Sequence, residues 1–133
     1  MIQFGYKMMT EEHGPKELVE NARMAEDAGF DFVSISDHFH PWLEAQGHSP
    51  FAWSVLGAIA HATSKIAITT GLTCPLIRYH PANIAQDAET IAVMSDNRCS
   101  LARCRPAAAR ELPICWAACS VAGAPTSAAG PQP

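Results

Sequence analysis

The chain has 133 residues, with 9 lysines and arginines against 13 aspartates and glutamates, and a formal net charge of −4 at pH 7. This length suits one domain with a substantial core. The mildly acidic balance gives no basic footprint for nucleic acid and no polybasic surface for anionic lipid, which argues against both kinds of partner.

The first half of residues 2–97 alternates between strand and helix patterns. Residues 2–8 are a short apolar run that suits a strand. Gly14-Pro15 then opens a helix, since proline is tolerated in the first turn, and Gly29 closes it as a C-cap. Residues 32–36 predict the next strand, and a loop over 37–50 follows.

The second half continues this alternation. A helix is predicted over residues 51–63, a strand over 66–73, a loop to His80, and a helix from Pro81 to about Asn97. Strands and helices joined by short connections predict βα units on a parallel sheet. The predicted fold is therefore α/β, namely the first three βα units of a TIM (β/α)8 barrel, truncated, because a closed barrel needs eight units.

After Asn97 the pattern changes. Residues 1–97 are predicted to form the barrel part, and residues 98–133 an aberrant or disordered tail rich in alanine, proline and cysteine. A fourth strand is due near Arg98, but no sustained period follows. One hypothesis is translation out of frame, and the alternative is a genuine low-complexity tail. Sequencing the coding DNA distinguishes them, because a shifted frame would restore the βα pattern.

The cysteines and histidines raise the question of a metal. Four cysteines lie after residue 97, with spacings that do not match the two-residue knuckles of zinc ribbons. His38 and His40 would share one face of a continuing strand, but Pro41 ends any extended ladder. We therefore expect no metal site. No secretory signal or membrane span is recognisable either, and the expected location is the cytoplasm.

The densest group of reactive side chains follows the second predicted strand, within residues 34–42. In alternating β/α folds the chemistry lies on loops after the carboxyl ends of parallel strands. Asp37, His38 and Trp42 are thus candidate site residues. Histidine can act as a base near neutral pH, and Asp37 could fix its tautomer. Adjacent strand residues point to opposite faces, so the two converge only if the strand ends between them.

These segments carry a family resemblance. The order Phe4-Gly5-Tyr6-Lys7, Gly14-Pro15, residues 36–42, residues 47–53 and residues 73–86 resembles the luciferase-like (β/α)8 superfamily. More narrowly, it is similar to the coenzyme F420-dependent branch that includes the F420-dependent glucose-6-phosphate dehydrogenases. The resemblance covers about residues 2–97, and it implies hydride transfer between coenzyme F420 and a small organic substrate.

The resemblance also implies roles for individual residues. His38 would accept a proton from the substrate hydroxyl, with Asp37 as its partner. Cofactor contacts would come from six positions, which are Glu11, Asp37, Trp42, Gly71, Leu72 and Cys74. A non-proline cis peptide is often found at the position of Gly71-Leu72 in this family.

Further expectations concern activity, cofactor and assembly. The glycine-rich segment and catalytic acid expected just beyond Asn97 are absent, so this chain is expected to be inactive by itself. An alternative cofactor is FMN with molecular oxygen, as in the monooxygenases of the superfamily. A third alternative is a non-catalytic fragment that acts only through assembly. Full-length relatives are expected to be homodimers.

Overall fold

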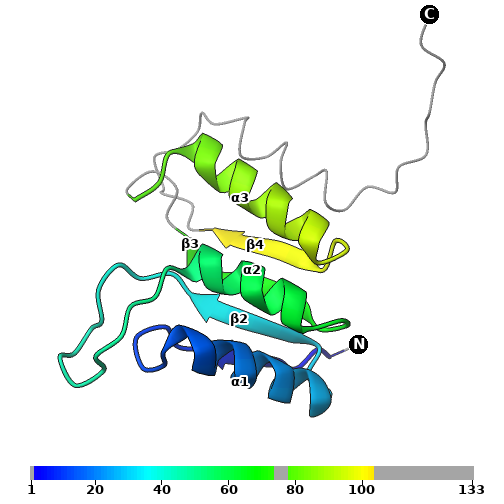
Figure 1. The fold of residues 1–133 in the computed structure, drawn as a ribbon, viewed down its shortest axis with the longest axis horizontal. Coiled ribbons are helices and arrows are strands. Elements are labelled where there is room, and N and C mark those ends of the chain that lie inside the picture. The colour runs from blue at the N-terminus through cyan, green and yellow to red at the C-terminus, as the bar shows by residue number, and fades with distance from the viewer. Residues whose placement is uncertain (1, 74–77, 104–133) are drawn as a thin grey trace, which may run out of the picture.

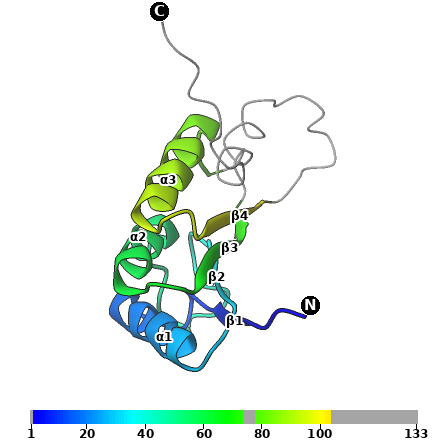
Figure 2. The same cartoon turned by 90° about the vertical axis from the view of Figure 1, so that its right-hand side faces the viewer.

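The computed structural model describes residues 2–73 and 78–103. Its four strands are parallel and lie side by side in chain order: β1 (Gly5–Met8), β2 (Phe32–Ser36), β3 (Ala67–Thr73) and β4 (Cys99–Arg103). They are connected by α1 (Pro15–Asp27), α2 (Ala52–Ala62) and α3 (Pro81–Met94). All three helices lie on one face of the sheet (Figures 1 and 2). The predicted α/β class with a parallel sheet is confirmed.

Local sequence explains where α1 begins and ends. Pro15 occupies the first turn, where its missing N–H leaves no hydrogen bond unmade. Gly29 follows the helix with a φ of 85°, a left-handed conformation that costs glycine little. Both ends therefore agree with the prediction, and β2 spans the predicted residues 32–36.

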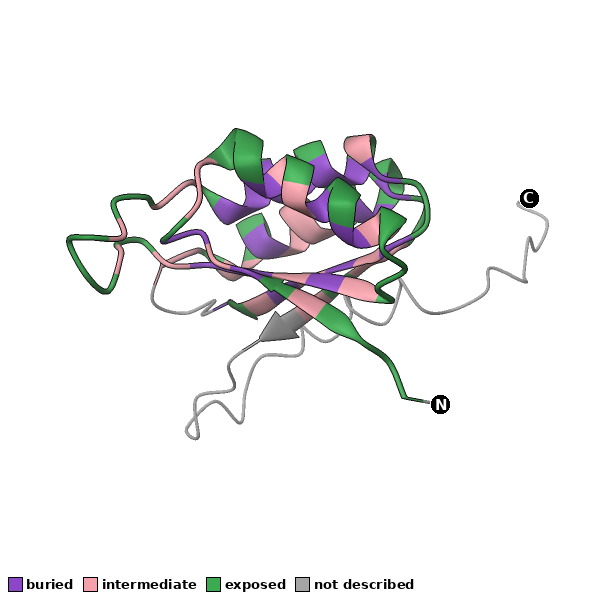
Figure 3. Ribbon diagram, turned by 90° about the horizontal axis from the view of Figure 1, so that it is seen from below, coloured by how far each residue is buried: buried purple, intermediate pink, exposed green. Residues whose placement is uncertain are grey.

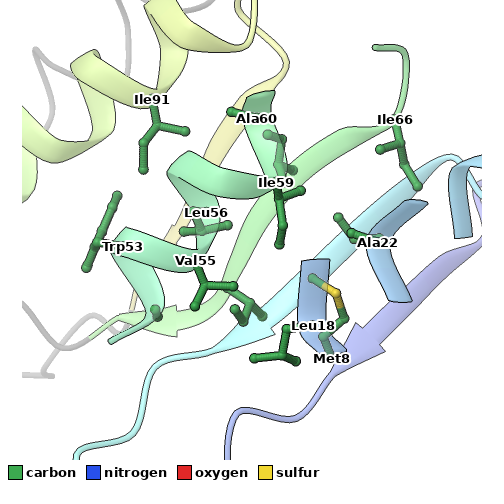
Figure 4. Packing of buried hydrophobic residues seen from close by; sticks show 14 of the residues in the cluster. Met8, Leu18, Ala22, Trp53, Val55, Leu56, Ile59, Ala60, Ile66 and Ile91 are labelled. Atoms are coloured by element: carbon green, nitrogen blue, oxygen red, sulfur yellow. The ribbon is translucent and has the colours of Figure 1, made fainter. Parts of the chain in front are cut away.

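The core lies between the helices and the sheet. Leu56 and Ile59 of α2 are fully buried and pack towards the central strands (Figure 4). Buried residues line the facing sides of both layers (Figure 3). Burying a side chain of this size contributes about 1.5–3 kcal/mol. This layer holds the strands in place and so fixes the positions of the loops that leave their carboxyl ends.

β4 corrects the prediction that the regular fold ends at Asn97. Cys99–Arg103 pairs in parallel with β3, and Cys99 and Leu101 pack against the core. The Arg98 guanidinium donates four hydrogen bonds, three of them to carbonyls at the end of α2 and the start of β3. The strand forms because backbone pairing and these anchors compensate for a weak β propensity. Residues 104–133, the rest of the predicted tail, lie outside the described residues.

No helix within the described ranges is long and apolar enough to cross a membrane.

One acidic side chain ties the end of α1 to the start of β3. The Glu26 carboxylate accepts hydrogen bonds from the amides of residues 64–66 and from the Ser64 hydroxyl, at 2.9–3.0 Å. Partial burial raises the pKa of Glu26, but the hydrogen bonds from residues 66, 65 and 64 outweigh it and lower the pKa to about 2. Glu26 therefore stabilises the fold as an anion, because its charged form is the one bound.

Exchanging Glu26 for glutamine is expected to lower the free energy of unfolding by about 1–2 kcal/mol at pH 7, because hydrogen bonds to a charged acceptor are lost. The folded-state pKa lies below the ordinary value of 4.5. The stabilisation is thus fully present above about pH 4.5 and is lost as the pH falls towards 2. Urea unfolding at pH 7 and pH 3 measures both effects.

Glu20→Gln is the matched control, since Glu20 only meets Arg23 at 3.5 Å on an exposed helix face. Equal losses in the two variants would contradict the role assigned to Glu26.

Candidate active site at the carboxyl ends of the strands

The parallel sheet brings three loops to one edge. Residues 9–14 follow β1, residues 37–51 follow β2, and residues 78–80 precede α3. The long loop after β2 projects from this edge, beyond the arrowheads of the strands (Figure 1). Ligand sites in β/α folds lie at such an edge, because loops of different strands converge there.

Glu11, in the loop after β1, is fully buried. Its Oε2 accepts a hydrogen bond of 2.7 Å from the Ser36 hydroxyl, at the end of β2. The Ser36 oxygen in turn accepts one of 2.8 Å from the Thr10 amide. A buried carboxylate is tolerated only when its oxygens are bonded, and this network supplies a donor to one of them.

The second carboxylate oxygen of Glu11 contacts Nδ1 of His38. An ionised carboxylate can only accept a hydrogen bond, so in this pair the imidazole proton lies on Nδ1. The other ring nitrogen, Nε2, then carries a free lone pair. This arrangement is the one required of a general base, which must accept a proton at an atom open to a ligand.

Trp42 competes for the same nitrogen. Its indole N–H lies 3.1 Å from Nδ1 of His38. Because Nδ1 cannot donate to Glu11 and accept from Trp42 at once, these hydrogen bonds are alternatives. In either case the two rings meet edge to face, with centroids 5.3 Å apart and an angle of 88° between their planes. Trp42 is 74% exposed, so most of the indole is open to a ligand.

The charge state of His38 also favours proton acceptance. Burial lowers the pKa of His38 below its ordinary value of 6.5, and the positive charges of Lys7 and Arg78 lower it further. This shift favours the neutral form of the imidazole. Its side chain is 37% exposed, which leaves it within reach of a substrate.

Asp37 is not the partner of His38, which corrects the prediction. Its Oδ1 accepts hydrogen bonds from the Arg78 guanidinium at 3.0 Å and from the Tyr79 hydroxyl at 2.7 Å. Its Oδ2 accepts one of 3.1 Å from Thr73. β2 ends at Ser36, and Asp37 then turns towards the β3 side while His38 turns towards Glu11. The Asp37 carboxylate thus links the loop after β2 to the segment before α3.

Arg78 and Tyr79 contact the candidate site but were not among the predicted site residues. The Arg78 guanidinium packs on the rings of Tyr79, Phe39 and Phe51, at 4.9, 5.5 and 5.8 Å from their centroids. Burial raises the pKa of Tyr79, and its hydrogen bond to Asp37 raises it further, so this hydroxyl stays protonated as a donor. No periodicity or spacing in the sequence indicates these contacts.

The remaining predicted residues lie on β3 or beyond it. Leu72 is 47% exposed near the end of the strand, and Gly71 precedes it. The peptide bonds of the described residues are all trans, so the cis bond expected at Gly71-Leu72 is absent. The register of β3 with β4 shifts between Thr70 and Thr73, as at a β-bulge. Cys74 lies outside the described residues.

Two further observations concern metal binding. His40 lies apart from His38, exposed, with Nδ1 hydrogen-bonded to the carbonyl of Pro41 at 2.8 Å. Within residues 2–73 and 78–103, no group of three or more histidine, cysteine, aspartate and glutamate side chains could hold a metal ion.

Comparison with known proteins identifies related sequences. Residues 1–103 match the family model for the luciferase-like monooxygenases. The F420-dependent glucose-6-phosphate dehydrogenase of Amycolatopsis mediterranei (strain U-32) is 43% identical over 98 residues, which are 74% of this chain and 29% of that protein. The F420-dependent hydroxymycolic acid dehydrogenase of Mycobacterium tuberculosis is 42% identical over 94 residues, or 71% and 26%. The chain thus spans less than a third of the length of these curated relatives.

Solved structures with a similar fold were also found. An F420-dependent secondary alcohol dehydrogenase in complex with an F420-acetone adduct has a TM-score of 0.73 at 42% identity, over 76% of this chain and 31% of that one. A type II Baeyer-Villiger monooxygenase constituent from Pseudomonas putida, in complex with FMN, has a TM-score of 0.62 at 17% identity, over 88% and 33%. The second likeness extends to the fold alone.

Proposed function

Since this chain belongs to the luciferase-like monooxygenase family, we propose that residues 1–97 form part of the active site of a coenzyme F420-dependent oxidoreductase. The substrate is a small alcohol, and the reaction is hydride transfer. The 42–44% identity to F420-dependent dehydrogenases supports this cofactor. FMN with oxygen is the weaker alternative, because a monooxygenase from Streptomyces bottropensis and the FMN-bound Baeyer-Villiger monooxygenase are only 24% and 17% identical to this chain.

The pair of Glu11 and His38 carries the proposal. Glu11 holds Nδ1 of His38 as a donor, which leaves Nε2 to take the proton of a substrate hydroxyl. As the carbon–hydrogen bond breaks, its electron pair leaves with the hydride and the O–H electrons form the carbonyl. The proton ends on Nε2, and the buried carboxylate stabilises the imidazolium that results.

The residues beside this pair fit a planar aromatic cofactor. Trp42, Phe39 and Leu72 expose apolar surface at the same edge of the sheet, at 74%, 80% and 47%. Exposed apolar groups around a polar pair are typical of a ligand site. Trp42, Gly71, Leu72 and Cys74 would hold the ring system. When bound, coenzyme F420 accepts the hydride that the substrate carbon releases.

The chain alone is proposed to be inactive, because β1 to β4 contribute only part of a barrel and its loops. The F420 proposal is tested in a chimera in which residues 1–97 replace the matching segment of the Amycolatopsis mediterranei relative. We expect bleaching of coenzyme F420 with glucose 6-phosphate as substrate, and none from the 133-residue chain. A folded chimera that leaves F420 oxidised but consumes oxygen with FMN would support the alternative instead.

A further inference from the structure

The long loop after β2 has both of its ends beside one side chain from another segment. It begins at Asp37 and ends at Phe51, directly before α2 (Figure 1). The Arg78 guanidinium, from the segment before α3, donates a hydrogen bond of 3.0 Å to Asp37, and its Cζ lies 5.8 Å from the centroid of the Phe51 ring. It also packs on Phe39, near the start of the loop, at 5.5 Å. Arg78 therefore holds the first and last residues of the loop at a common point.

The Asp37 carboxylate faces this contact and not solvent, since only 1% of its side chain is exposed. It also accepts hydrogen bonds from the Tyr79 hydroxyl at 2.7 Å and from Thr73, at the end of β3, at 3.1 Å. A buried carboxylate requires a cation and several donors, because its desolvation is otherwise costly. We call Asp37, Arg78 and Tyr79 the clamp, because they join the loop after β2 to the segment before α3.

Aromatic rings surround the cation of the clamp. The Tyr79 ring lies 4.9 Å from Cζ of Arg78, and it meets the Phe51 ring at a centroid distance of 5.9 Å. A guanidinium can stack on aromatic faces while its N–H groups donate in the plane, whereas an ammonium group has no such plane. The arrangement therefore fits arginine at position 78 better than lysine, although both carry one positive charge.

The clamped loop carries the proposed base. His38 follows Asp37 directly, and its carbonyl accepts a hydrogen bond of 2.9 Å from the Ser49 hydroxyl across the loop. The His48 amide donates to the carbonyl of Glu11 at 3.1 Å, which ties the returning arm of the loop to the segment after β1. The loop is thus fastened on the β1 side by these bonds and on the β3 side by the clamp. A reacting group that is displaced by about 1 Å can lose on the order of 10²-fold in rate.

We propose that Arg78 is a positioning residue, whose guanidinium fastens both ends of the loop after β2 so that His38 and Trp42 are in place before a ligand binds. The inference rests on the proposed function, in which His38 is the base. Arg78 takes no proton and acts through the loop. A loop that is ordered in advance spares the ligand the entropy of ordering it, and it keeps Nε2 of His38 at one position.

The first test measures backbone order in the 133-residue chain by ¹⁵N relaxation. In Arg78→Met, the order parameters of residues 39–42 are expected to fall from about 0.85, typical of rigid backbone, to below about 0.6. Should this variant fail to fold because the Asp37 carboxylate loses its cation, Asp37→Asn combined with Arg78→Met provides the test, since an amide carries no charge. Arg23→Met is the control, because it removes a positive charge from an exposed face of α1.

The second test measures kinetics in the chimera that carries residues 1–97. Arg78→Met is expected to lower kcat on the order of 10- to 10²-fold. KM for glucose 6-phosphate is expected to change little, because Arg78 is not proposed to contact the substrate. Arg78→Lys, which keeps a cation beside Asp37 but loses the planar contact with the rings, is expected to recover part of this loss. Circular dichroism of each variant gives the folded fraction, so that kcat refers to folded molecules.

The outcomes separate the two proposals. Wild-type order parameters in Arg78→Met would overturn the clamp, and so would an equal loss of order in Arg23→Met, which would reduce the effect to net charge. If the loop loosens but kcat of the folded chimera is unchanged, the role of Arg78 in positioning the base is overturned. If the loop loosens in Arg78→Met and the unsubstituted chimera does not reduce coenzyme F420, the proposed function fails while the clamp stands.

Discussion

In a complete barrel that contains residues 1–97, exchanging His38 for asparagine lowers kcat by on the order of 10²- to 10⁴-fold, the usual contribution of a general base. Asparagine can still meet the Glu11 carboxylate through its amide N–H, so the buried acid keeps a donor. What is lost is the lone pair of Nε2. Steady-state kinetics of the chimera described above measure this effect.

His40→Asn is the control for that experiment, since His40 is exposed and bonds only to the carbonyl of Pro41. It is expected to change kcat by less than about twofold, because no part of its ring meets Glu11 or His38. In the parent chimera, the rate should also fall as the pH drops through the lowered pKa of His38. A His38 variant that retains wild-type kcat would exclude this residue as the base.

Glu11→Gln has an effect of similar size for a different reason. The Ser36 hydroxyl still donates to the amide oxygen, which leaves the amide NH₂ facing Nδ1 of His38. Nδ1 must then accept, so the ring proton moves to Nε2 and the lone pair that takes the substrate proton is gone. We expect kcat to fall on the order of 10²- to 10⁴-fold, as when a histidine is held in the wrong tautomer.

The tautomer can be read directly in the 133-residue chain. Imidazole ¹⁵N chemical shifts should show the proton of His38 on Nδ1 in the wild type and on Nε2 in Glu11→Gln. Glu12→Gln, an exposed neighbour, should leave the tautomer unchanged. An unchanged tautomer in Glu11→Gln would show that the carboxylate does not orient the ring.

The regular elements up to Asn97 could be predicted because local rules and burial agree there. The apolar run of β2 and the proline and glycine at the ends of α1 each indicate the structure that forms. A fourth strand was due near Arg98, but β4 could not be recognised there, because Cys99–Arg103 contains no β-branched or aromatic residue. Its pairing depends on β3 and on Arg98, which the local sequence does not indicate.

The candidate site could be predicted in part. The loop after β2 was located from polarity, and the resemblance pointed to Glu11. Which acid meets His38 could not be decided, because Asp37 is adjacent in sequence whereas Glu11 is 27 residues away and reaches the ring only through strand pairing. Tyr79 belongs to a segment that carries the resemblance, but nothing in the sequence indicated its hydrogen bond to Asp37.

The order of the strands has a consequence for how the chain acquires its structure. Each strand pairs with the next one along the chain, with no crossover that must wait for a distant segment. Pairing with the next strand closes a shorter loop than pairing with a more distant strand would, so less loop entropy is lost. A βα unit can therefore dock on its predecessor during synthesis. The cluster of Glu11, Ser36 and His38 comes from the first two strands and the loops that follow them.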